Sequence, residues 1–576
     1  RLWRSPDRGD SWTPVSGDLT RNTNRYTLEM MGRVWSVDAL YDNGAMSQYA
    51  TLTSISESPV AEGVLYTGSD DGLLQVSEDG GETWRRAAPL PGVHERAFVN
   101  DVQASEHDPG TVFVVADAHK FGDYRPHVFA SADRGRSWRS IAGDLPEGTI
   151  AWAIEQDDED PDLFFLATEY GLYFTPDRGG RWFELRAGVP TIAFRDLKLQ
   201  RRDDDLVGAS FGRGFYVLDD YGPLREIAAG ALAAEATLFP VRDAWWYVPN
   251  VPMQARGMPT LGTTSWTAEN PPYGAVFTYW LAETPTTARE ERRARERELR
   301  DRGEDVPFPG WERLRDETME TGPRLFAEVR DAAGRPIRRI EGPAEEGLQR
   351  VAWDLRGPAP DPVELEEPGF RPPWDTPPRG PLVAPGRYEA ELFLVSEAGV
   401  RALGEPRTFR VKPVPTVPGS PDHDAVAAFR AETSELARRA EGASEILDRL
   451  DETLRHMGEA LMRAPGADPA LFGRVEGAGD TLDSLRVRLS GDPVRARMNE
   501  PAEPSIRGRI ENVVSGHWDT RQAPTATQRR DVQIAREAFA GFRDDLAALQ
   551  ERVAELERAL EAAGAPWTPG RGVPPS

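Results

Sequence analysis

The sequence predicts a mainly β protein with an α-helical end: β-propeller blades first, then a β-sandwich, then an antiparallel helical bundle. Three observations lead to this fold class. One motif, Ser/Thr-x-Asp-x-Gly-x-x-Trp, occurs four times in the first third of the chain. Alternating strand-like runs separated by turns fill the middle, and an apolar spacing of three and four residues takes over after residue 420.

The four copies of this motif, called the turn motif below, span residues 5–12, 77–84, 131–138 and 175–182. We expect its aspartate to accept N–H groups within its own turn, and its glycine to take a positive φ. We expect its tryptophan to bury its ring between neighbouring blades. The residues with these structural roles are Asp7, Trp12, Asp79, Trp84, Asp133, Trp138, Asp177 and Trp182. A metal role is not expected, because the alternating carboxylates of a calcium loop are missing.

An apolar hairpin accompanies the motif in each repeat. In one of them, residues 64–76 form two apolar runs around Asp70-Asp71-Gly72, which is a hairpin-turn signal. Another strand-like run comes before each hairpin, and a fourth follows each motif. The preceding runs are residues 50–56, 98–104, 150–156 and 192–200. Four antiparallel strands repeated in tandem are typical of propeller blades, which we place over residues 1–225.

The turn motif resembles the Asp-box, or BNR repeat, of sialidases, xyloglucanase-type glycoside hydrolases and sortilin. Residues 211–220, Phe-Gly-Arg-Gly-Phe-Tyr-Val-Leu-Asp-Asp, resemble the closing blade of bacterial sortilin-like and BNR "glycosyl hydrolase" proteins. The resemblance implies a secreted, periplasmic or cell-surface protein with a propeller of roughly six or more blades. Because residues 1–225 hold only about four and a half repeats, we expect further blades before Arg1.

Composition excludes several classes of function. Asp and Glu outnumber Lys and Arg by 95 to 69, a formal charge of −26, which argues against binding to nucleic acid or to an anionic membrane. The chain has no cysteine, so a disulfide framework and a thiolate metal site are impossible. No apolar run approaches the roughly 20 residues of a membrane span. We expect no cofactor.

One face of the blades is predicted to hold the ligand. The loops between the second and third strands of each blade and those leading into each first strand share the face opposite the turn motif. Arginines, aromatic residues and carboxylates in these loops suit a sugar or peptide ligand. The candidates for ligand binding are Asp71, Arg96, His119, Tyr124, Tyr170, Arg195 and Arg213.

Two functions use this same face. The first is binding of a peptide, a protein or a glycan. The alternative is a xyloglucanase- or sialidase-like glycoside hydrolase, which needs two carboxylates roughly 5 to 9.5 Å apart. The weak candidates for these are Asp70, Asp101, Glu169 and Asp196. A sialidase would also need three arginines and a tyrosine, for which Arg96, Arg195, Arg213 and Tyr170 are available, but its Arg-Ile-Pro segment is absent. Binding is favoured because no motif singles out a catalytic pair.

The middle of the chain predicts a connecting segment over residues 226–270 and a β-sandwich over 271–415. Two insertions are expected in the sandwich: residues 286–321, with a solvated helix over 288–302, and the Pro-rich residues 358–385. Residues 347–355, followed by Pro-Gly-Arg-Tyr at 385–388, are similar to an Ig-like domain of the flagellar-hook-cap type. That resemblance implies an accessory domain without an activity of its own.

Residues 420–564 predict a helical bundle. Helices are expected from a Ser420-Pro421-Asp422 cap to about residue 463, over 468–489, and from Thr525 onward, with 506–518 as a loop. The last helix carries a heptad seam: Val532, Ala535, Phe539, Phe542, Leu546, Leu549, Val553, Leu556 and Leu560. A three-helix antiparallel bundle within the chain is favoured. Because the same seam serves pairing between chains, a homo-oligomer is the alternative.

Overall fold

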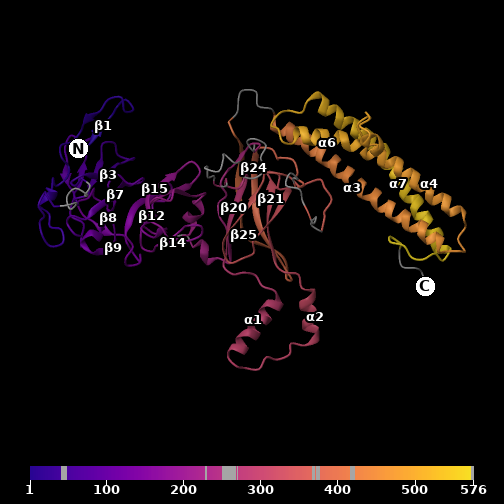
Figure 1. The fold of residues 1–576 in the computed structure, drawn as a ribbon, viewed down its shortest axis with the longest axis horizontal. Helices are drawn as coiled ribbons and strands as arrows, with labels where there is room; N and C mark the ends of the chain where they lie inside the picture. Colours follow the sequence, from indigo (N-terminus) through magenta and orange to yellow (C-terminus); the bar gives the residue numbers. More distant parts are fainter. Residues whose placement is uncertain are drawn as a thin grey trace. The chain divides into compact units, whose positions relative to one another are not determined.

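The computed structural model describes residues 1–39, 48–227, 230–249, 268, 270–365, 370, 377–415 and 422–571. The contacts divide the chain into unit 1, Arg1–Glu235, and unit 2, Ala236–Ser576. Figure 1 traces both from indigo to yellow. The fold class is as predicted: propeller blades, a sandwich and a helical bundle follow one another along the chain.

Unit 1 is a series of antiparallel sheets, each a blade. The strands, in chain order, are β1 (Trp3–Arg4) and β2 (Thr13–Pro14); β3 (Leu52–Glu57), β4 (Leu65–Ser69), β5 (Leu74–Ser77) and β6 (Arg85–Arg86); β7 (Phe98–Ala104), β8 (Val112–Ala118), β9 (Asp123–Ser131) and β10 (Arg139–Ser140); β11 (Ala151–Gln156), β12 (Phe164–Thr168), β13 (Gly171–Thr175) and β14 (Phe183–Leu185); β15 (Phe194–Gln200), β16 (Asp205–Ser210) and β17 (Phe215–Leu218).

Apolar side chains hold neighbouring blades together. Each of three buried clusters draws its residues from two successive sheets. Between the second and third four-stranded sheets, Phe113 and Phe164 meet edge to face with ring centroids 4.7 Å apart. The first strands β3, β7, β11 and β15 also contact one another in sequence, and we call them the inner strands. A repeated strand pattern therefore becomes one stack of blades because successive sheets bury the faces that they turn toward each other.

Unit 2 begins with a two-layer β-sandwich. One layer has the order β18 (Ala236–Leu238), β20 (Ala275–Leu281), β23 (Gly347–Trp353); the other is β19 (Ala244–Trp246), β25 (Gly399–Pro413), β24 (Gly386–Ser396), β21 (Arg324–Asp331), β22 (Pro336–Gly342). Inward residues of both layers, such as Phe277, Trp353 and Phe409, form one core. The alternation read from the sequence produces this core, because every second side chain of a strand points inward.

The sandwich starts earlier than predicted. Strands β18 and β19 lie in the segment that we expected to be a connection, residues 226–270. Each has three residues, which is too short for an alternating pattern to show. Of the aromatic residues in and beside β19, Trp246 is fully buried, whereas Trp245 and Tyr247 are exposed.

The first insertion forms two helices, α1 (Ala288–Asp301) and α2 (Trp311–Met319), of which only the first was predicted. Thr287 caps α1 in a capping box with Glu290. Arg292 of α1 binds Glu317 of α2, with its Nε 2.8 Å from Oε1, so that the pair ties the two helices together. The second insertion is described at 358–365, 370 and 377–385 only.

The end of unit 2 is a helical bundle with an up-down-up course. Its helices are α3 (His423–Met462), α4 (Ala470–Ser490), α5 (Pro493–Arg497), α6 (Ile506–His517) and α7 (Ala526–Ala562). Helix α4 pairs with the later half of α3, as in Arg486 with Asp448, and α6 pairs with the earlier half, as in Arg507 with Glu441. The return leg of the bundle is therefore made by α4 and α6 in succession. Figure 1 shows α3 and α7 running the length of the bundle, with α6 beside them near one end and α4 near the other.

The bundle corrects two predictions. Residues 506–518 are not a loop but mostly helix α6, which was missed because its buried positions, such as Ile506, Ile510 and Val513, are too few to establish a period. The cap of α3 is Asp422, which accepts the N–H groups of its first turn; Ser420 and Pro421 lie outside the described residues.

The heptad seam of α7 is buried against the chain's own helices. All nine seam residues belong to the bundle core together with residues of α3, α4 and α6. The seam that suggested pairing between chains is thus already used within one chain. Among the described residues, no helix is both long and apolar enough to cross a membrane.

Candidate functional site

The two ends of each blade carry different chemistry. In a four-stranded antiparallel sheet, the turn from the second to the third strand lies at one end, and the other two turns lie at the opposite end. The turn motif joins the third and fourth strands, as between β5 and β6. We call its end the turn face, and we call the opposite end the loop face.

At the turn face, each motif aspartate is held by its own turn. Asp79 accepts the Ser77 hydroxyl at 2.8 Å and the Thr83 N–H at 2.9 Å. The same bonds reach Asp7, Asp133 and Asp177 in the other copies. The hydrogen bonds, chiefly from Ser11, lower the pKa of Asp7 to about 2. The residue after each aspartate and the following glycine both have positive φ, so the four turns share one backbone path.

The motif tryptophans connect successive blades. Trp138 donates its indole N–H to the Ala88 carbonyl at 2.9 Å, and Trp182 donates to the Ile141 carbonyl at 3.0 Å, each in the preceding repeat. Trp182 is 7% exposed, but Trp12 is 57% exposed. The expected burial between blades therefore does not hold for Trp12, whose indole bonds only to Gly9 of its own turn.

Each inner strand has a β-bulge at the same place, so residues of different inner strands can be compared by counting from the bulge. The extra residue is Thr53 in β3, Asn100 in β7, Trp152 in β11 and Arg195 in β15. The residues directly after the bulge are Ser54, Asp101, Ala153 and Asp196, and those two positions further on are Ser56, Gln103, Glu155 and Lys198. Because alternate residues of a strand share a side, these two rows line the inner surface of the blades.

In the blades of β3 and β7, these polar residues accept backbone N–H groups of the next inner strand. Ser54 and Ser56 accept the N–H groups of Val102 and Ala104 at 2.8 and 2.9 Å. Asp101 and Gln103 do the same for Ile154 and Gln156, at 3.1 and 2.9 Å. An edge strand otherwise leaves such N–H groups unpaired, so the common role of these rows is structural.

The pattern breaks between β11 and β15. Ala153 has no polar atom, and Glu155 forms an ion pair with the Lys198 side chain instead of accepting a backbone N–H. Gln103 donates to Glu155 at 2.8 Å. Burial raises the pKa of Glu155 to about 7, in spite of Lys198, and the charges of Asp101 and Asp196 add to the effect. A cavity of about 200 Å³ opens at this point, lined by Gln103, Glu155 and Lys198.

Of the predicted catalytic carboxylates, only two belong to this inner surface. Asp101 is partly buried and accepts the Ile154 N–H, and its desolvation raises its pKa. Asp196 is exposed and accepts the N–H of Leu197 at 2.9 Å. Asp101, Asp196, Glu155 and Lys198 interact electrostatically, so the structure assembles one charged group from three inner strands.

The structure removes two other candidates. Asp70 is buried in the β4–β5 turn and accepts the Thr51 N–H at 2.8 Å. Asp71 is fully buried and accepts the Ser69 hydroxyl at 2.6 Å and the Arg21 N–H at 2.8 Å. Neither carboxylate is available to a ligand, because both already accept hydrogen bonds within the protein. Asp70 holds the backbone at Thr51, and Asp71 holds Ser69 of the turn and the backbone of Arg21. Because both residues are polar and lie in a turn, we expected them to be exposed. The contact with Arg21, which is distant in the sequence, buries them instead.

The loop face does bring together Glu169 and Arg195. The Arg195 guanidinium lies 3.5 Å from the ring centre of Trp152 and 4.9 Å from that of Phe211. Glu169 accepts the Trp152 indole N–H at 2.9 Å and lies 3.6 Å from Arg195 Nη2. We call Trp152, Glu169, Arg195 and Phe211 the arginine stack. Tyr170, Phe211 and Phe215 around it are 61, 71 and 75% exposed.

Of the remaining loop-face candidates, all but Arg213 belong to the blade of β7–β10 and the loop that leads into it. His119 Nδ1 is 2.5 Å from Asp117 Oδ2, and Arg96 lies over the ring of Phe121 at 5.4 Å. Phe121 also stacks on His94. Tyr124 is exposed there, as is Arg213 in the β16–β17 turn. Arg96 and Arg195 thus stack on different aromatic residues, and no contact joins them into the arginine triad of a sialidase.

Metal ligation has no support in the part of the chain that the structure describes. No group of three His, Asp or Glu side chains there has the arrangement to hold an ion. The described residues offer two kinds of chemistry. The inner cavity holds a carboxylate with a raised pKa, Glu155, and the loop face presents a cation, a carboxylate and aromatic rings in the arginine stack.

Glu155, Lys198 and Phe211 were not singled out from the sequence. A signal was present: counting two residues beyond the shared bulge gives Ser, Gln, Glu and Lys, a row that changes from blade to blade. These four residues can be aligned with one another only when the positions of the bulges are known. A bulge in an inner strand cannot be recognised reliably from the sequence.

No protein-family model matches the chain, and no curated protein sequence matches it. Among solved structures, the Niastella koreensis GH74 enzyme is similar at 13% identity, over 30% of this chain and 29% of that one, with a TM-score of 0.25. The GH74 xyloglucanase of Xanthomonas campestris is similar at 20% identity, over 29 and 28%, with a TM-score of 0.24. YCF48 bound to D1 peptide is similar at 19% identity, over 30 and 52%, with a TM-score of 0.23.

The matched part is therefore well under two thirds of each of those proteins. At such scores the likeness carries no argument about activity or ligand, and the fold rests on the strand order of this chain itself.

Proposed function

We propose that unit 1 is a ligand-binding propeller module that holds a peptide, a protein or a glycan at its loop face. The observation that carries this proposal is the arginine stack, in which the Arg195 guanidinium is ordered between two aromatic rings beside a carboxylate. Arginine held on aromatic faces is already oriented for a carboxylate, a carbonyl or a hydroxyl of a ligand, so that less entropy is lost on binding.

The surroundings of the stack support binding further. Tyr170, Phe211 and Phe215 are large aromatic side chains exposed on neighbouring turns. Exposed aromatic clusters are costly to leave in water, and they mark surfaces that stack on sugar rings or apolar peptide side chains. The Asp-box and sortilin-like resemblance, and a secreted, periplasmic or cell-surface location, are part of the same proposal.

A second candidate function is glycoside hydrolysis at the inner surface. The observation that favours it is the raised pKa of Glu155, about 7, which the charge of a second, partly buried carboxylate, Asp101, helps to raise. A general acid works best when its pKa lies near the working pH, and glycosidases pair such an acid with a second carboxylate. Lys198 and Gln103, however, already bind Glu155, and edge capping explains Asp101.

The experiment is a binding screen of the full chain against a glycan array and a random-peptide library, followed by affinity measurements on the hits. Arg195→Ala is expected to weaken the affinity about tenfold or more, because it removes a charged, stacked contact. Arg186→Ala is the matched control, since Arg186 is an exposed arginine paired with Glu184 at the end of a neighbouring blade. Equal affinities for wild type and Arg195→Ala would place the ligand elsewhere.

The screen also separates the two candidates. Glycans that bind are incubated with the protein, and release of sugar is followed. Turnover that Asp101→Asn or Glu155→Gln abolishes would establish the hydrolase and displace the binding proposal; the same applies to Glu169→Gln and Asp196→Asn. Fractionation of the native host, with the protein found only in the cytosol, would contradict the proposed location.

A further inference from the structure

The blades hold a second cavity, at the turn face instead of the loop face. It has a volume of about 330 Å³ and lies between the sheets β7–β10 and β11–β14. Its walls come from the β7–β8 and β11–β12 turns and from the beginning of β10 and of the β13–β14 turn. None of the residues proposed above for the loop face lines it.

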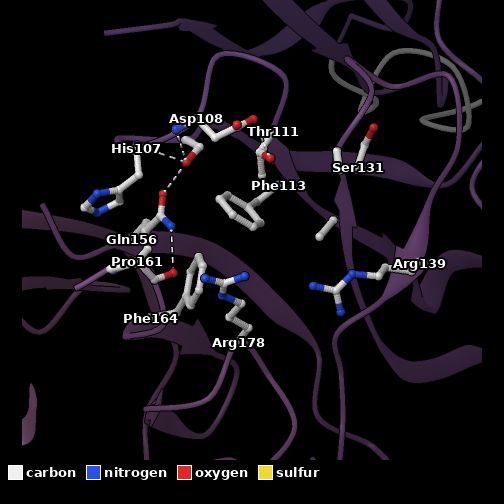
Figure 2. Close-up of a pocket in the computed structure, with 13 residues that line it drawn as sticks. His107, Asp108, Thr111, Phe113, Ser131, Arg139, Gln156, Pro161, Phe164 and Arg178 are labelled. Carbon is white, nitrogen blue, oxygen red and sulfur yellow. Dashed lines mark hydrogen bonds between the residues drawn. The ribbon is translucent and has the colours of Figure 1, made fainter. Parts of the chain in front are cut away.

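Two arginines enter this cavity from opposite walls, and Figure 2 shows their guanidinium groups reaching toward one another below Phe113. We call it the two-arginine cavity. The backbone of Arg139 pairs with Ala130 in the sheet, but its side chain makes no hydrogen bond or ion pair with any residue that the structure describes. Arg178 binds Asp162 through its Nε, which leaves its terminal nitrogens free to face the cavity. Two guanidinium groups in one small space repel each other, and an anion between them removes that repulsion.

The acidic side chain of the cavity is already occupied. Asp108 accepts the Gly110 N–H at 2.8 Å and the Thr111 hydroxyl at 3.0 Å. In Figure 2 Asp108 and Thr111 lie on the far side of Phe113 from the two arginines. The chain as a whole carries a formal charge of −26, but the two arginines give this cavity a positive charge that favours an anion.

The floor of the cavity is apolar. Phe113 and Phe164 are both buried, and they meet edge to face at 4.7 Å. Beside them, the polar groups of Gln156 are satisfied: its Oε1 accepts the Ser105 hydroxyl at 2.8 Å, and its Nε2 donates to the Pro161 carbonyl at 3.0 Å. A ligand therefore meets fixed aromatic surface at the floor and positive charge at the rim.

We propose that the two-arginine cavity binds a carboxylate that carries a small apolar or aromatic group. The planar carboxylate matches the fork of donors on a guanidinium, and the apolar group fits the phenylalanine floor. A volume of about 330 Å³ suits one such group. Both a small free acid and the C-terminal residue of a peptide have this chemistry.

Calorimetric titration of the full chain with three probes tests the proposal. The probes are phenylacetate, N-acetyl-glycyl-phenylalanine with a free carboxylate, and the C-terminal amide of the same dipeptide. We expect the two carboxylates to bind and the amide to bind about tenfold more weakly or not at all, because the amide cannot form the charged pair. Tighter binding of the dipeptide acid identifies a peptide C-terminus as the source, and tighter binding of phenylacetate identifies a small free acid.

Arg139→Gln is the decisive variant, because Arg139 has no partner whose loss would disturb the fold. It is expected to weaken carboxylate binding about tenfold, whereas Arg186→Gln, an exposed arginine outside the cavity, leaves it unchanged. A thermal melt of each variant checks that it is folded. Equal binding of the acid and the amide, unchanged affinity in Arg139→Gln, or no binding of any probe at millimolar concentration would each overturn the proposal.

Discussion

The turn motifs and the inner strands show two ways in which a repeated sequence is used. At the four turn motifs, the same residue types make the same bonds in every copy: Asp7, Asp79, Asp133 and Asp177 each accept a hydroxyl and an N–H of their own turn. At the inner strands, one backbone bulge recurs, but the side chain two residues beyond it changes from Ser56 to Gln103, Glu155 and Lys198.

The difference separates residues that build a blade from residues that distinguish one blade from another. A position that every repeat fills in the same way serves the backbone that all repeats share. A position that differs between repeats on a common backbone takes on chemistry of its own where it leaves that role: Ser56 and Gln103 still accept an N–H of the next inner strand, whereas Glu155 and Lys198 pair with each other. Glu155 and Arg195 are of the second kind, and they anchor the two candidate sites of unit 1.

The largest expected effect compares two tryptophans at the same motif position. Trp182→Ala is expected to cost about 3–5 kcal/mol of unfolding free energy, because it empties a buried site between blades and removes the bond to Ile141. Trp12→Ala is expected to cost less than about 1 kcal/mol, because that ring is 57% exposed. Urea denaturation of the full chain, followed by fluorescence, measures both. If the two variants lost the same unfolding free energy, the claim that Trp182 joins two blades and Trp12 does not would be wrong.

The next effect concerns pH and the inner strands. The folded-state pKa of Glu155, about 7, lies above its ordinary value of 4.5, so the folded protein holds this proton more tightly. Stability from this proton is fully present below about pH 4.5 and is lost as the pH rises through about 7. At about 1.4 kcal/mol per pKa unit, the loss is at most about 3.5 kcal/mol.

Glu155→Gln is the matched variant for that measurement. Denaturation at about pH 5 and about pH 8 should show a steeper fall in stability for wild type than for Glu155→Gln. The groups that face Glu155 are Lys198, Asp101 and Asp196, so Lys198→Met is expected to raise the pKa of Glu155 further. Identical pH profiles for wild type and Glu155→Gln would show that another group governs this range.

A smaller effect distinguishes two aspartates in the same row of the inner strands. Asp101→Ala leaves the buried N–H of Ile154 without an acceptor and is expected to cost about 1–3 kcal/mol. Asp196→Ala removes an exposed side chain that binds only its neighbour Leu197, and it is expected to change stability by less than about 0.5 kcal/mol. The pair is measured by the same denaturation experiment, and a larger loss for Asp196→Ala would contradict the assignment.

The smallest effect is at the turn motif in acid. Hydrogen bonds from the Ser137 and Ser131 hydroxyls lower the pKa of Asp133, so its contribution to stability is present above the ordinary pKa of a carboxyl and fades as the pH falls. The carboxylate is exposed and screened by solvent, which keeps the effect small. Melting temperatures measured down to acidic pH should fall more steeply for wild type than for Asp133→Asn. If the melting temperatures of both proteins fell in parallel, Asp133 would not contribute to the loss of stability in acid.

Much of the architecture could be predicted because it is local. The turn motif, the hairpin turn at Asp70-Asp71-Gly72 and the seam of α7 each depend on residues close together in the chain, and they indicated blades, hairpins and a long helix. Strands β18 and β19 and helix α6 escaped because three residues, or a short helix with few buried positions, have no period that can be recognised.

The candidate sites were predictable only in part. Arg195, Glu169 and Tyr170 were chosen by residue type and by their place in the loops, and the structure puts Arg195 and Glu169 into the arginine stack. Asp70 and Asp71 were chosen by the same reasoning, yet both are buried in backbone contacts. Residue type alone cannot distinguish an exposed carboxylate from one that caps a turn, because both uses favour the same polar residue.

The sequence by itself determined where strands turn, since a motif such as Asp133 to Trp138 satisfies its own polar groups within a few residues. Only the tertiary structure decided which charges meet. Glu155 and Lys198 are 43 residues apart, and Arg139 and Arg178 belong to different blades; each pair is joined only when successive sheets stack. Burial between blades then raises the pKa of Glu155 and places both arginines in one cavity, and neither effect is contained in a residue's near neighbours.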